Sequence, residues 1–476
     1  MLLLTVNLFA QFPAQKERQM DSLLDAFVKN RQFTGVVLVA DRKKILYKRV
    51  IGMASREDKI PNTLETNFNI ASMGKTFTAT MIMQLVGEGK LSLDQKLSSI
   101  IPGDSIRNAD QITIRHLLTH SSGVGNYMAA PGYPENCHQL KTLKDVLPYV
   151  RAQEPTLAAP GAGFDYSNSG FILLGRVIEA VTGKSYIDNL QERIYKPLGI
   201  QHSYLHYPAT FKAPAEAVPY LAFTANTYVN GVADEFPAFS DGGMQSNAPD
   251  LLKFARGLLS GKILSPFLRD TMWAGKIDFY RGDRYSFGWM DNKNDYGKTV
   301  YSHDGGGKGF TSDLKIVPAD GYVVIVLINN KVNAREFSTS ILDIMYKGTW
   351  EQPELYTEAR LMEVIEAKGF EYLQSHFSEI INGFKLAKAP DARVYIKLSD
   401  MLDMLNHPDQ ALAVCEMGRK AFPGEVSLYN VSGQIYMNHK QFTDAETWFR
   451  KALTVDPNDG YAKMMLQQLK VQETSH

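Results

Sequence analysis

Ser72 and Lys75 lie three residues apart in the segment NIASMGKTF, and this pair is suited to covalent chemistry. On a helix, side chains three apart share a face and can reach each other. A lysine held away from bulk water loses its proton more readily, so Lys75 could accept the proton of the Ser72 hydroxyl. The start of a helix also offers free backbone N–H groups for a developing oxyanion. Taken alone, the pair fits a helix-capping serine beside a surface lysine equally well.

A second Ser-x-x-Lys pair, Ser312 and Lys315, lies in a segment predicted to be a strand. Residues three apart in a strand face opposite sides of a sheet, so these two side chains cannot cooperate. The comparison favours Ser72 as the nucleophile.

Tyr166 and Asn168 lie in PGAGFDYSNSGF, a glycine-rich loop that runs into a predicted helix. Such loops often display functional side chains. A tyrosine near a lysine could shuttle protons, and the asparagine amide could hold a substrate amide. The same Tyr-x-Asn spacing recurs at residues 228–230 and 436–438, so the setting of the first copy distinguishes it and the motif alone does not.

The segment SHDGGGKGF, residues 302–310, allows three interpretations. Its glycines and Lys308 suggest a phosphate loop, His303 and Asp304 suggest a metal site or a charge relay, and the glycine backbone suggests the edge of a substrate cleft. A phosphate loop requires Gly-x4-Gly-Lys-Ser/Thr between a strand and a helix. Here Lys308 is followed by Gly309 and then by another predicted strand, so the phosphate interpretation is disfavoured.

His116 and His120 are four residues apart, a spacing that zinc ligands on a helix can have. The segment lacks the intervening glutamate and any evident third ligand, so we interpret them as structural histidines. The sequence therefore predicts neither a metal nor another cofactor.

The elements that must position these residues follow a simple order. Residues 34–50 read as two strands joined by a polar turn, and residues 296–330 read as three more strands. Between them, residues 72–86 form a helical stretch that is apolar on most sides, as buried helices are, and residues 171–183 form a helix that ends at a glycine. Strands, then helices, then strands predict an α/β or α+β unit whose sheet is assembled from both ends of the domain.

Ser-x-x-Lys, Tyr-x-Asn and His-x-Gly, in this order, resemble the serine beta-lactamase and penicillin-binding-protein family. The resemblance is greatest to its class C-like branch, which includes D,D-peptidases, D-aminopeptidases and esterases. The segments IRHLLTHSSGV (114–124), YKPLGI (195–200) and DGGMQSNAPDLLKF (241–254) are also similar to family segments. The resemblance covers residues 20–345 and implies an antiparallel sheet flanked by helices.

The resemblance implies a role for each residue of the first two motifs. Ser72 would be the acylated nucleophile, and Lys75 and Tyr166 would share general-base and general-acid work. Asn168 would bind the amide carbonyl of the substrate.

The resemblance also implies that His303, Asp304 and Gly305 line the cleft, and that the N–H groups of Gly306 and Ser72 form the oxyanion hole. Many penicillin-recognising relatives carry Lys-Thr-Gly on this strand, whereas His303 replaces the lysine here and Asp304 the hydroxyl residue. The aspartate argues against recognition of a substrate carboxylate, because like charges repel.

Composition limits the classes of partner. Lysine plus arginine equals aspartate plus glutamate at 51 each, which gives no net charge to attract nucleic acid or a membrane surface. The two cysteines are far apart, which argues against a disulfide framework and a thiolate metal site.

The apolar run MLLLTVNLFA has the length of a signal-peptide core, so residues 1–15 are predicted to direct export to the periplasm or cell envelope. The alternative is a short buried segment.

The C-terminal region is predicted to be an all-α domain of helical repeats. Four residues recur 34 positions later: Tyr395, Leu402, Ala411 and Pro423 correspond to Tyr429, Tyr436, Ala445 and Pro457. The second copy resembles the tetratricopeptide repeat. We predict a helical linker or degenerate repeat at 350–390 and two repeats with a capping helix at 391–476, which could bind a protein partner. A plain helical bundle is the alternative.

The leading hypothesis is a serine hydrolase that forms an acyl-enzyme on Ser72 and cleaves an amide or ester, with a D-amino-acid-containing peptide as the candidate substrate. Hydrolysis of β-lactams is less favoured, because the Lys-Thr-Gly form is absent. A carboxylesterase of the same family is the nearest alternative. A protein that has lost catalysis, and senses a ligand in the cleft while its repeats recruit a partner, is the alternative from a different class.

Overall fold

The computed structural model describes residues 13–31, 33–205, 216–222, 224, 227–231, 237–280, 282–353, 356–386 and 389–473. The apolar run on which the predicted signal segment depends lies outside these residues. The chain divides into two compact units, the first comprising Met1–Leu221 with Asn230–Gln352 and the second Ala222–Val229 with Pro353–His476.

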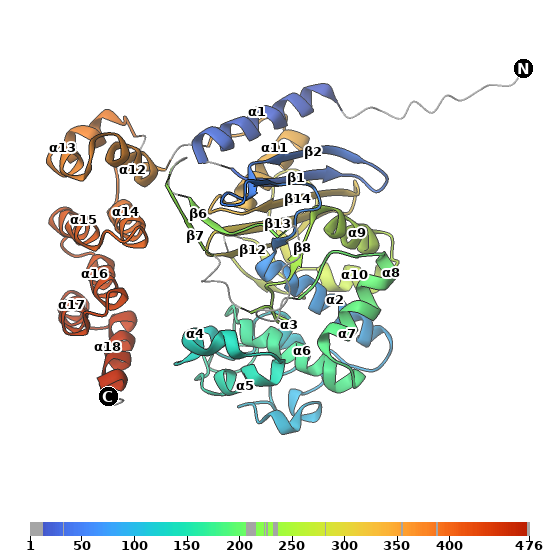
Figure 1. The fold of residues 1–476 in the computed structure, drawn as a ribbon. Helices are drawn as coiled ribbons and strands as arrows, with labels where there is room; N and C mark the ends of the chain where they lie inside the picture. The colour runs from blue at the N-terminus through green and yellow to red at the C-terminus, as the bar shows by residue number, and fades with distance from the viewer. Residues whose placement is uncertain are drawn as a thin grey trace, which may run out of the picture. The chain divides into compact units, whose positions relative to one another are not determined.

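The first unit is organised around an eight-stranded antiparallel sheet with the order β2-β1-β14-β13-β12-β11-β10-β9 (Figure 1). Its strands are β1 (Gly35–Ala40), β2 (Ile45–Ile51), β9 (Ile277–Asp278), β10 (Arg284–Tyr285), β11 (Met290–Asn292), β12 (Val300–Gly307), β13 (Phe310–Val317) and β14 (Tyr322–Ile328). Strand β1 pairs with both β2 and β14, so the sheet is assembled from the two ends of the unit, which confirms the sequence prediction.

Both faces of the sheet are covered. On β14, Val324, Val326 and Ile328 pack with α1 (Ala14–Arg31) and α11 (Ala334–Tyr346). The alternate side chains pack on the other face with α2 (Lys75–Gly87), α6 (Asn168–Thr182), α9 (Ala248–Leu259) and α10 (Pro266–Trp273). In Figure 1, α1 and α11 lie above the sheet and α2, α9 and α10 below it. Two buried faces explain why β14 is apolar at nearly every position.

Shorter helices and strands lie in the sequence between the strands that form the sheet. The helices are α3 (Ile114–Leu118), α4 (Tyr133–Asn136), α5 (Leu143–Arg151), α7 (Tyr186–Leu190) and α8 (Lys196–Leu198). The short strands are β3 (Met53–Ser55), β4 (Ile60–Pro61), β5 (Phe68–Asn69), β6 (Tyr220–Ala222), β7 (Tyr228–Asn230) and β8 (Gln245–Ser246).

The predicted helix at residues 72–86 is present and central, but its first turn differs from the prediction. Residues Ala71–Gly74 form a 3₁₀ turn, and the α-helix α2 begins at Lys75. Side chains three apart are eclipsed in a 3₁₀ turn, so Ser72 and Lys75 still share a face. Nearly every side chain of α2 is buried, as its apolar surface predicts.

From Pro353 onward the second unit is all-helical where the structure describes it, and its other segment, Ala222–Val229, includes parts of β6 and β7. Its helices are α12 (Thr357–Lys368), α13 (Phe370–Gly383), α14 (Ala392–Met404), α15 (Pro408–Ala421), α16 (Val426–Asn438), α17 (Phe442–Val455) and α18 (Gly460–Glu473). Helices α14, α16 and α18 begin 34 residues apart.

Small residues allow close packing at equivalent places in the two repeats. A Cβ at Gly433 would lie 2.7 Å from the Phe449 ring, and the Ser399 hydroxyl lies 3.0 Å from the sulfur of Cys415. The spacing supports a helical repeat, and its assignment to the tetratricopeptide family stays a prediction.

None of the helices in the described part of the chain is long and apolar enough to cross a membrane.

The two units have separate hydrophobic cores, so we expect the first to fold without the second. A chain that ends at Gln352 should unfold cooperatively and at the same midpoint as the first unit of the full chain, because both clusters that cover the sheet lie within residues 20–345. Calorimetry on the two chains would check this. A shortened chain that fails to fold would show that the helical unit stabilises the first one.

Candidate active site

The backbone just before Ser72 is held in an uncommon conformation. Ala71 has φ 44°, in the left-handed region that non-glycine residues seldom adopt, at a cost of about 1–3 kcal/mol. Its N–H donates to Oδ1 of Asn69 at 2.9 Å, and its carbonyl accepts from the N–H of Gly243 at 3.2 Å. These bonds hold a sharp turn that presents Ser72 at the mouth of a pocket.

Lys75 is fully buried and makes three hydrogen bonds to oxygen atoms. Its Nζ lies 3.0 Å from Oγ of Ser72, 2.7 Å from Oδ1 of Asn168 and 2.6 Å from the backbone carbonyl of Asp241. The last two oxygens have no proton to give, so Nζ must donate to both. A neutral amine in this position would direct its lone pair at the Ser72 hydroxyl, and this arrangement suits a general base.

The Tyr166 ring completes the surroundings of Lys75. The ring centroid lies 5.0 Å from Nζ of Lys75 and 4.1 Å from the centroid of the His120 ring. The loop before α6 is tied to His120, because the Asp165 N–H donates to the His120 carbonyl at 2.7 Å and the Ser167 N–H donates to its Nδ1 at 3.1 Å. The structure therefore brings Ser72, Lys75, Tyr166 and Asn168 together from segments that lie far apart in the sequence.

Asp241 is a further residue of this site that motif reasoning did not single out. Burial raises the pKa of its carboxyl to about 6, although the nearby Lys75 ammonium opposes this rise. Its Oδ2 accepts a hydrogen bond of 3.0 Å from the Tyr127 hydroxyl. The sequence feature that could have pointed to Asp241 is the family-like segment DGGMQ, which begins at this aspartate.

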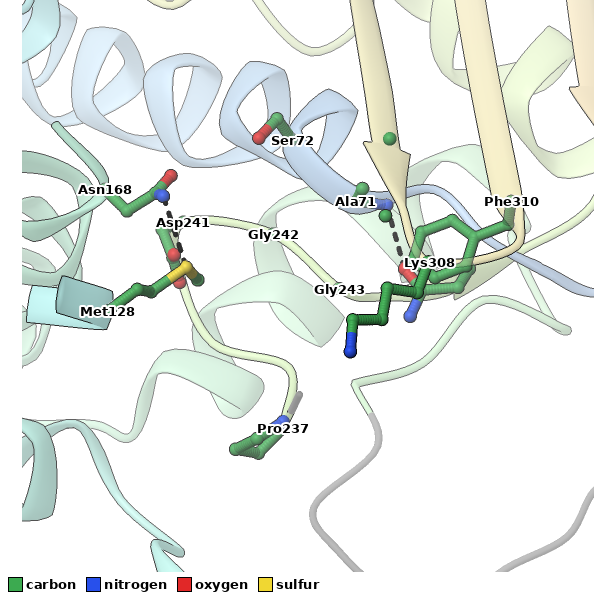
Figure 2. Close-up of a pocket in the computed structure, with 13 residues that line it drawn as sticks. Ala71, Ser72, Met128, Asn168, Pro237, Asp241, Gly242, Gly243, Lys308 and Phe310 are labelled. Carbon is green, nitrogen blue, oxygen red and sulfur yellow. Dashed lines mark hydrogen bonds between the residues drawn. The ribbon is translucent and has the colours of Figure 1, made fainter. Parts of the chain in front are cut away.

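A pocket of about 190 Å³ opens beside Ser72 (Figure 2). The residues around it include the polar side chains of Ser72, Asn168, Asp241 and Lys308, the apolar Met128, Pro237 and Phe310, and the backbone of Gly306 and Gly307. Three of the residues expected there, His303, Asp304 and Gly305, do not line it.

His303 is buried and occupied by hydrogen bonds within the protein. Its Nε2 lies 3.0 Å from the Tyr285 hydroxyl, which lies 3.2 Å from Nε2 of His120. Since Nδ1 of His120 accepts from Ser167, its proton is on Nε2 and is donated to Tyr285. The Tyr285 hydroxyl then donates to His303, whose Nδ1 donates to the Asp304 carbonyl at 2.7 Å. Each donor in this series of hydrogen bonds has one acceptor, provided that both histidines are neutral.

The electrostatic surroundings keep both histidines neutral. Burial, aided by the Lys75 ammonium, lowers the pKa of His303 to about 3, and the same two causes hold the pKa of His120 well below its ordinary value. The expectation that His303 is a cleft residue in place of a lysine therefore needs correction. His303 joins β12 to Tyr285 of β10 through a hydrogen bond and does not line the pocket.

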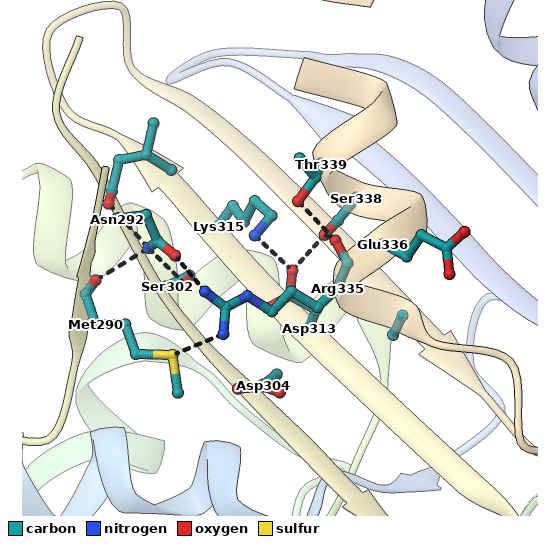
Figure 3. Close-up of polar contacts among 12 residues, drawn as sticks. Met290, Asn292, Ser302, Asp304, Asp313, Lys315, Arg335, Glu336, Ser338 and Thr339 are labelled. Atoms are coloured by element: carbon teal, nitrogen blue, oxygen red, sulfur yellow. Dashed lines mark hydrogen bonds and ion pairs between the residues drawn. The ribbon is translucent and has the colours of Figure 1, made fainter. Parts of the chain in front are cut away.

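The expectation that Asp304 lines the cleft also needs correction, because Asp304 lies on the opposite face of the sheet from His303. Successive residues of a strand alternate between faces. Asp304 is paired across β12 and β13 with Asp313, which accepts a hydrogen bond from Ser338 of α11 (Figure 3). The carboxylate thus faces the α11 side and does not line the pocket.

Gly305 contributes by close packing and has no contact with the pocket. A Cβ at this position would lie 2.1 Å from the carbonyl oxygen of Ile70, and the Ser312 hydroxyl donates to the same oxygen at 2.9 Å. Strand β12 therefore contacts the Ser72 turn directly, which brings the exposed Gly306 to the pocket.

The second Ser-x-x-Lys pair is arranged as predicted. Ser312 contacts the Ser72 turn, whereas Lys315 forms an ion pair of 3.2 Å with Asp313 on the other face.

His116 caps α3, since its Nδ1 accepts from the Thr113 N–H at 3.3 Å. Within the described ranges, no three histidine, cysteine, aspartate or glutamate side chains are grouped so that they could hold a metal ion.

Substitution of Gly305 by alanine should damage the site, because the added methyl group would clash with Ile70. Overpacking of this kind costs about 1–3 kcal/mol. The neighbouring Gly306→Ala variant is the matched control for stability, since a Cβ there meets no atom within 4 Å. Thermal unfolding should show a lower midpoint for Gly305→Ala alone. Equal midpoints for the two variants would contradict the close approach.

The raised pKa of Asp241 predicts a pH-dependent stability. The folded-state pKa of about 6 exceeds the ordinary value of 3.8, so the native state binds a proton between these values and loses stability as pH rises through 6. Asp241→Asn should therefore gain up to about 3 kcal/mol relative to the parent between pH 4 and pH 7.5. Denaturant unfolding across this range would measure the gain. The exposed Asp278→Asn is the control, and a pH-independent difference for Asp241→Asn would refute the shift.

The chain is similar to known proteins in both sequence and structure. A family profile described as beta-lactamase matches residues 20–343. Penicillin-binding protein 4 of Amycolatopsis lactamdurans is 28% identical over 342 residues, which cover 67% of this chain and 86% of that protein. Teichoic acid D-alanine hydrolase of Staphylococcus aureus is 25% identical, with 65% of this chain and 74% of that protein covered.

Among solved structures, D-amino acid amidase from Ochrobactrum anthropi SV3 complexed with D-phenylalanine superimposes with a TM-score of 0.62. It is 25% identical, and the match covers 70% of this chain and 99% of that one. The profile match spans the sheet, the Ser72 turn and every residue around the pocket. The chain therefore belongs to the beta-lactamase family.

Proposed function

We propose that this protein is a serine hydrolase that cleaves an amide or ester through an acyl-enzyme on Ser72. The observation that carries the proposal is the hydrogen bond of 3.0 Å between Nζ of Lys75 and Oγ of Ser72. Asn168 and Asp241 hold this buried amine so that one direction is left for the serine proton.

The proposed reaction uses residues that already lie together. Ser72 Oγ attacks the carbonyl carbon of the substrate while its proton passes to Lys75. The N–H groups of Ser72 and Gly306 stabilise the oxyanion, and each such donor is typically worth about 10²–10³ in rate. The proton then passes through Tyr166 to the leaving group as the scissile bond breaks. Water attacks the acyl-enzyme in the second half, gives its proton to the same base, and releases the acid and Ser72.

The substrate class is proposed to be an amide or ester of a D-amino acid. Two relatives support it, because one is named as a D-alanine hydrolase and the other as a D-amino acid amidase. The pocket of about 190 Å³ is small, and its apolar wall of Met128, Pro237 and Phe310 suits a short acyl group. A carboxylesterase would use the same residues.

Export and partner binding belong to the same proposal. The apolar N-terminal run supports export to the cell envelope. The helical unit supports a protein partner, since helical repeats commonly present binding surfaces. A protein that only senses a ligand is less well supported, because Ser72 lines the pocket and is hydrogen-bonded to the buried Lys75.

A fluorophosphonate probe tests the central step. The parent protein should gain one adduct on Ser72 by intact-mass analysis, and Ser72→Ala should gain none. Lys75→Met should react about 10²–10⁴ times more slowly, the usual contribution of a general base. Ser260→Ala, which alters an exposed serine at the end of α9, should react like the parent.

No adduct on folded parent protein would favour the ligand-sensing alternative, and an adduct that survives Ser72→Ala would place the nucleophile elsewhere. Amidase and esterase activities separate by kcat/KM for a D-alanine amide against a short acyl ester.

A further inference from the structure

A second pocket of the first unit, here called the Arg42 pocket, is formed by the turn between β1 and β2 and by two helices. Arg42 comes from the turn, Arg256 from α9 and Leu198 from α8. Its volume is about 430 Å³, within the range of roughly 300–1,000 Å³ that small-molecule sites occupy. None of the described residues that line it also lines the Ser72 pocket, so the two pockets are separate.

The Arg42 pocket is positively charged. No acidic residue lines it among the described residues, and four of its lining residues are basic: Arg42, Lys253, Arg256 and Lys262. The chain as a whole has 51 basic and 51 acidic residues, so this concentration of one charge is a local departure from neutrality. Cations held close together repel one another, and an anion bound between them relieves the repulsion.

Backbone carbonyls hold the two arginines in place without removing their charge. Nη1 of Arg42 donates to the Leu259 carbonyl at 3.2 Å, and its Nη2 donates to the Pro318 carbonyl at 2.7 Å. Nε and Nη2 of Arg256 both donate to the Asp41 carbonyl, at 3.1 and 2.9 Å. A guanidinium has five N–H donors, so each arginine is fixed in position while it keeps donors for a ligand.

Two carboxylates lie close to these cations without neutralising all of them. Asp250 is fully buried and forms an ion pair of 2.8 Å with Lys253. The Oδ1 of Asp41 accepts hydrogen bonds of 2.7 Å from the backbone N–H groups of Lys43 and Lys44. Four lining cations therefore adjoin two carboxylates, and positive charge remains in excess.

From these contacts we infer that the Arg42 pocket binds a phosphate group. A phosphate presents oxygen acceptors in several directions, which suits guanidinium and ammonium donors that come from different elements. A carboxylate presents two oxygens in one plane and carries a single charge, so it matches four cations less well. A soluble phosphate ester and a phospholipid headgroup share this chemistry. The binding is separate from the proposed hydrolysis at Ser72 and additional to it.

Calorimetric titration of the full chain with inorganic pyrophosphate tests the inference. The parent should bind it at low ionic strength, and added salt should weaken the binding, because Arg42 and Lys262 are exposed to solvent. Lys262→Gln should weaken the binding by roughly threefold, as an exposed ion pair does. Arg42→Gln combined with Lys262→Gln should weaken it by roughly tenfold or more, because hydrogen bonds to a charged group are also lost.

The control variants isolate the charge and the place. Lys262→Arg keeps the charge and should bind within about twofold of the parent. Lys144→Gln removes an exposed lysine of α5 that does not line the pocket, and it should bind like the parent. Ser72→Ala should also bind like the parent, since the two pockets share no described residue. The thermal midpoint of Lys262→Gln should equal that of the parent, because the side chain is exposed.

Vesicle sedimentation separates the two sources of the phosphate group. If a lipid headgroup is the ligand, vesicles of phosphatidylglycerol mixed with phosphatidylcholine should retain more of the parent than vesicles of phosphatidylcholine alone. Pyrophosphate binding without vesicle binding would assign the pocket to a soluble phosphate ester. In either case the double variant of Arg42 and Lys262 should show the loss.

Three results would each overturn the inference. One is a parent that binds neither pyrophosphate nor the phosphatidylglycerol vesicles, and another is unchanged binding in the double variant. The third is loss of binding in Ser72→Ala, which would place the anion in the Ser72 pocket. All of these measurements record binding without turnover, so failure of the fluorophosphonate probe to modify Ser72 would refute the proposed function and leave this result unaffected.

Discussion

The buried amine of Lys75 is the constraint on which the site depends. A lysine removed from water requires polar partners, because an unpaired buried charge is strongly destabilising. Its three oxygen partners come from the Ser72 turn, the start of α6 and the segment before β8. Satisfying this one group therefore fixes the relative positions of three segments that lie far apart in the chain.

Close backbone contacts supply the rest of the geometry. Gly305 allows β12 to touch the Ile70 carbonyl, and Gly242 allows the Asp241 segment to approach Ala71, where a Cβ would lie 2.4 Å from the carbonyl oxygen. No side chain larger than hydrogen could occupy these positions without moving the Ser72 turn. The glycines that first suggested a phosphate loop are thus explained by packing at Gly305 and by an open backbone at Gly306.

Local patterns were sufficient to predict the strands at residues 34–50 and 296–330, the buried helix after Ser72, and the separation of Ser312 from Lys315. These features depend on hydrophobic periodicity and strand alternation, which neighbouring residues determine. The environments of His303 and Asp241 could not be predicted in this way, because Tyr285, His120 and Lys75 reach them through long-range contacts. The orientation of Asp304 follows from alternation along β12, once the face that His303 occupies is known.

A crystal structure of the phosphonylated protein would test most directly whether Lys75 and the backbone of β12 serve one reaction at Ser72. We expect phosphorus to be bonded to Ser72 Oγ and a phosphonyl oxygen to lie within hydrogen-bond distance of the N–H groups of Ser72 and Gly306. Nζ of Lys75 would remain on Asn168 and the Asp241 carbonyl. A phosphonyl oxygen directed into solvent, or an adduct on another residue, would contradict a shared role of Lys75 and β12 in a reaction at Ser72.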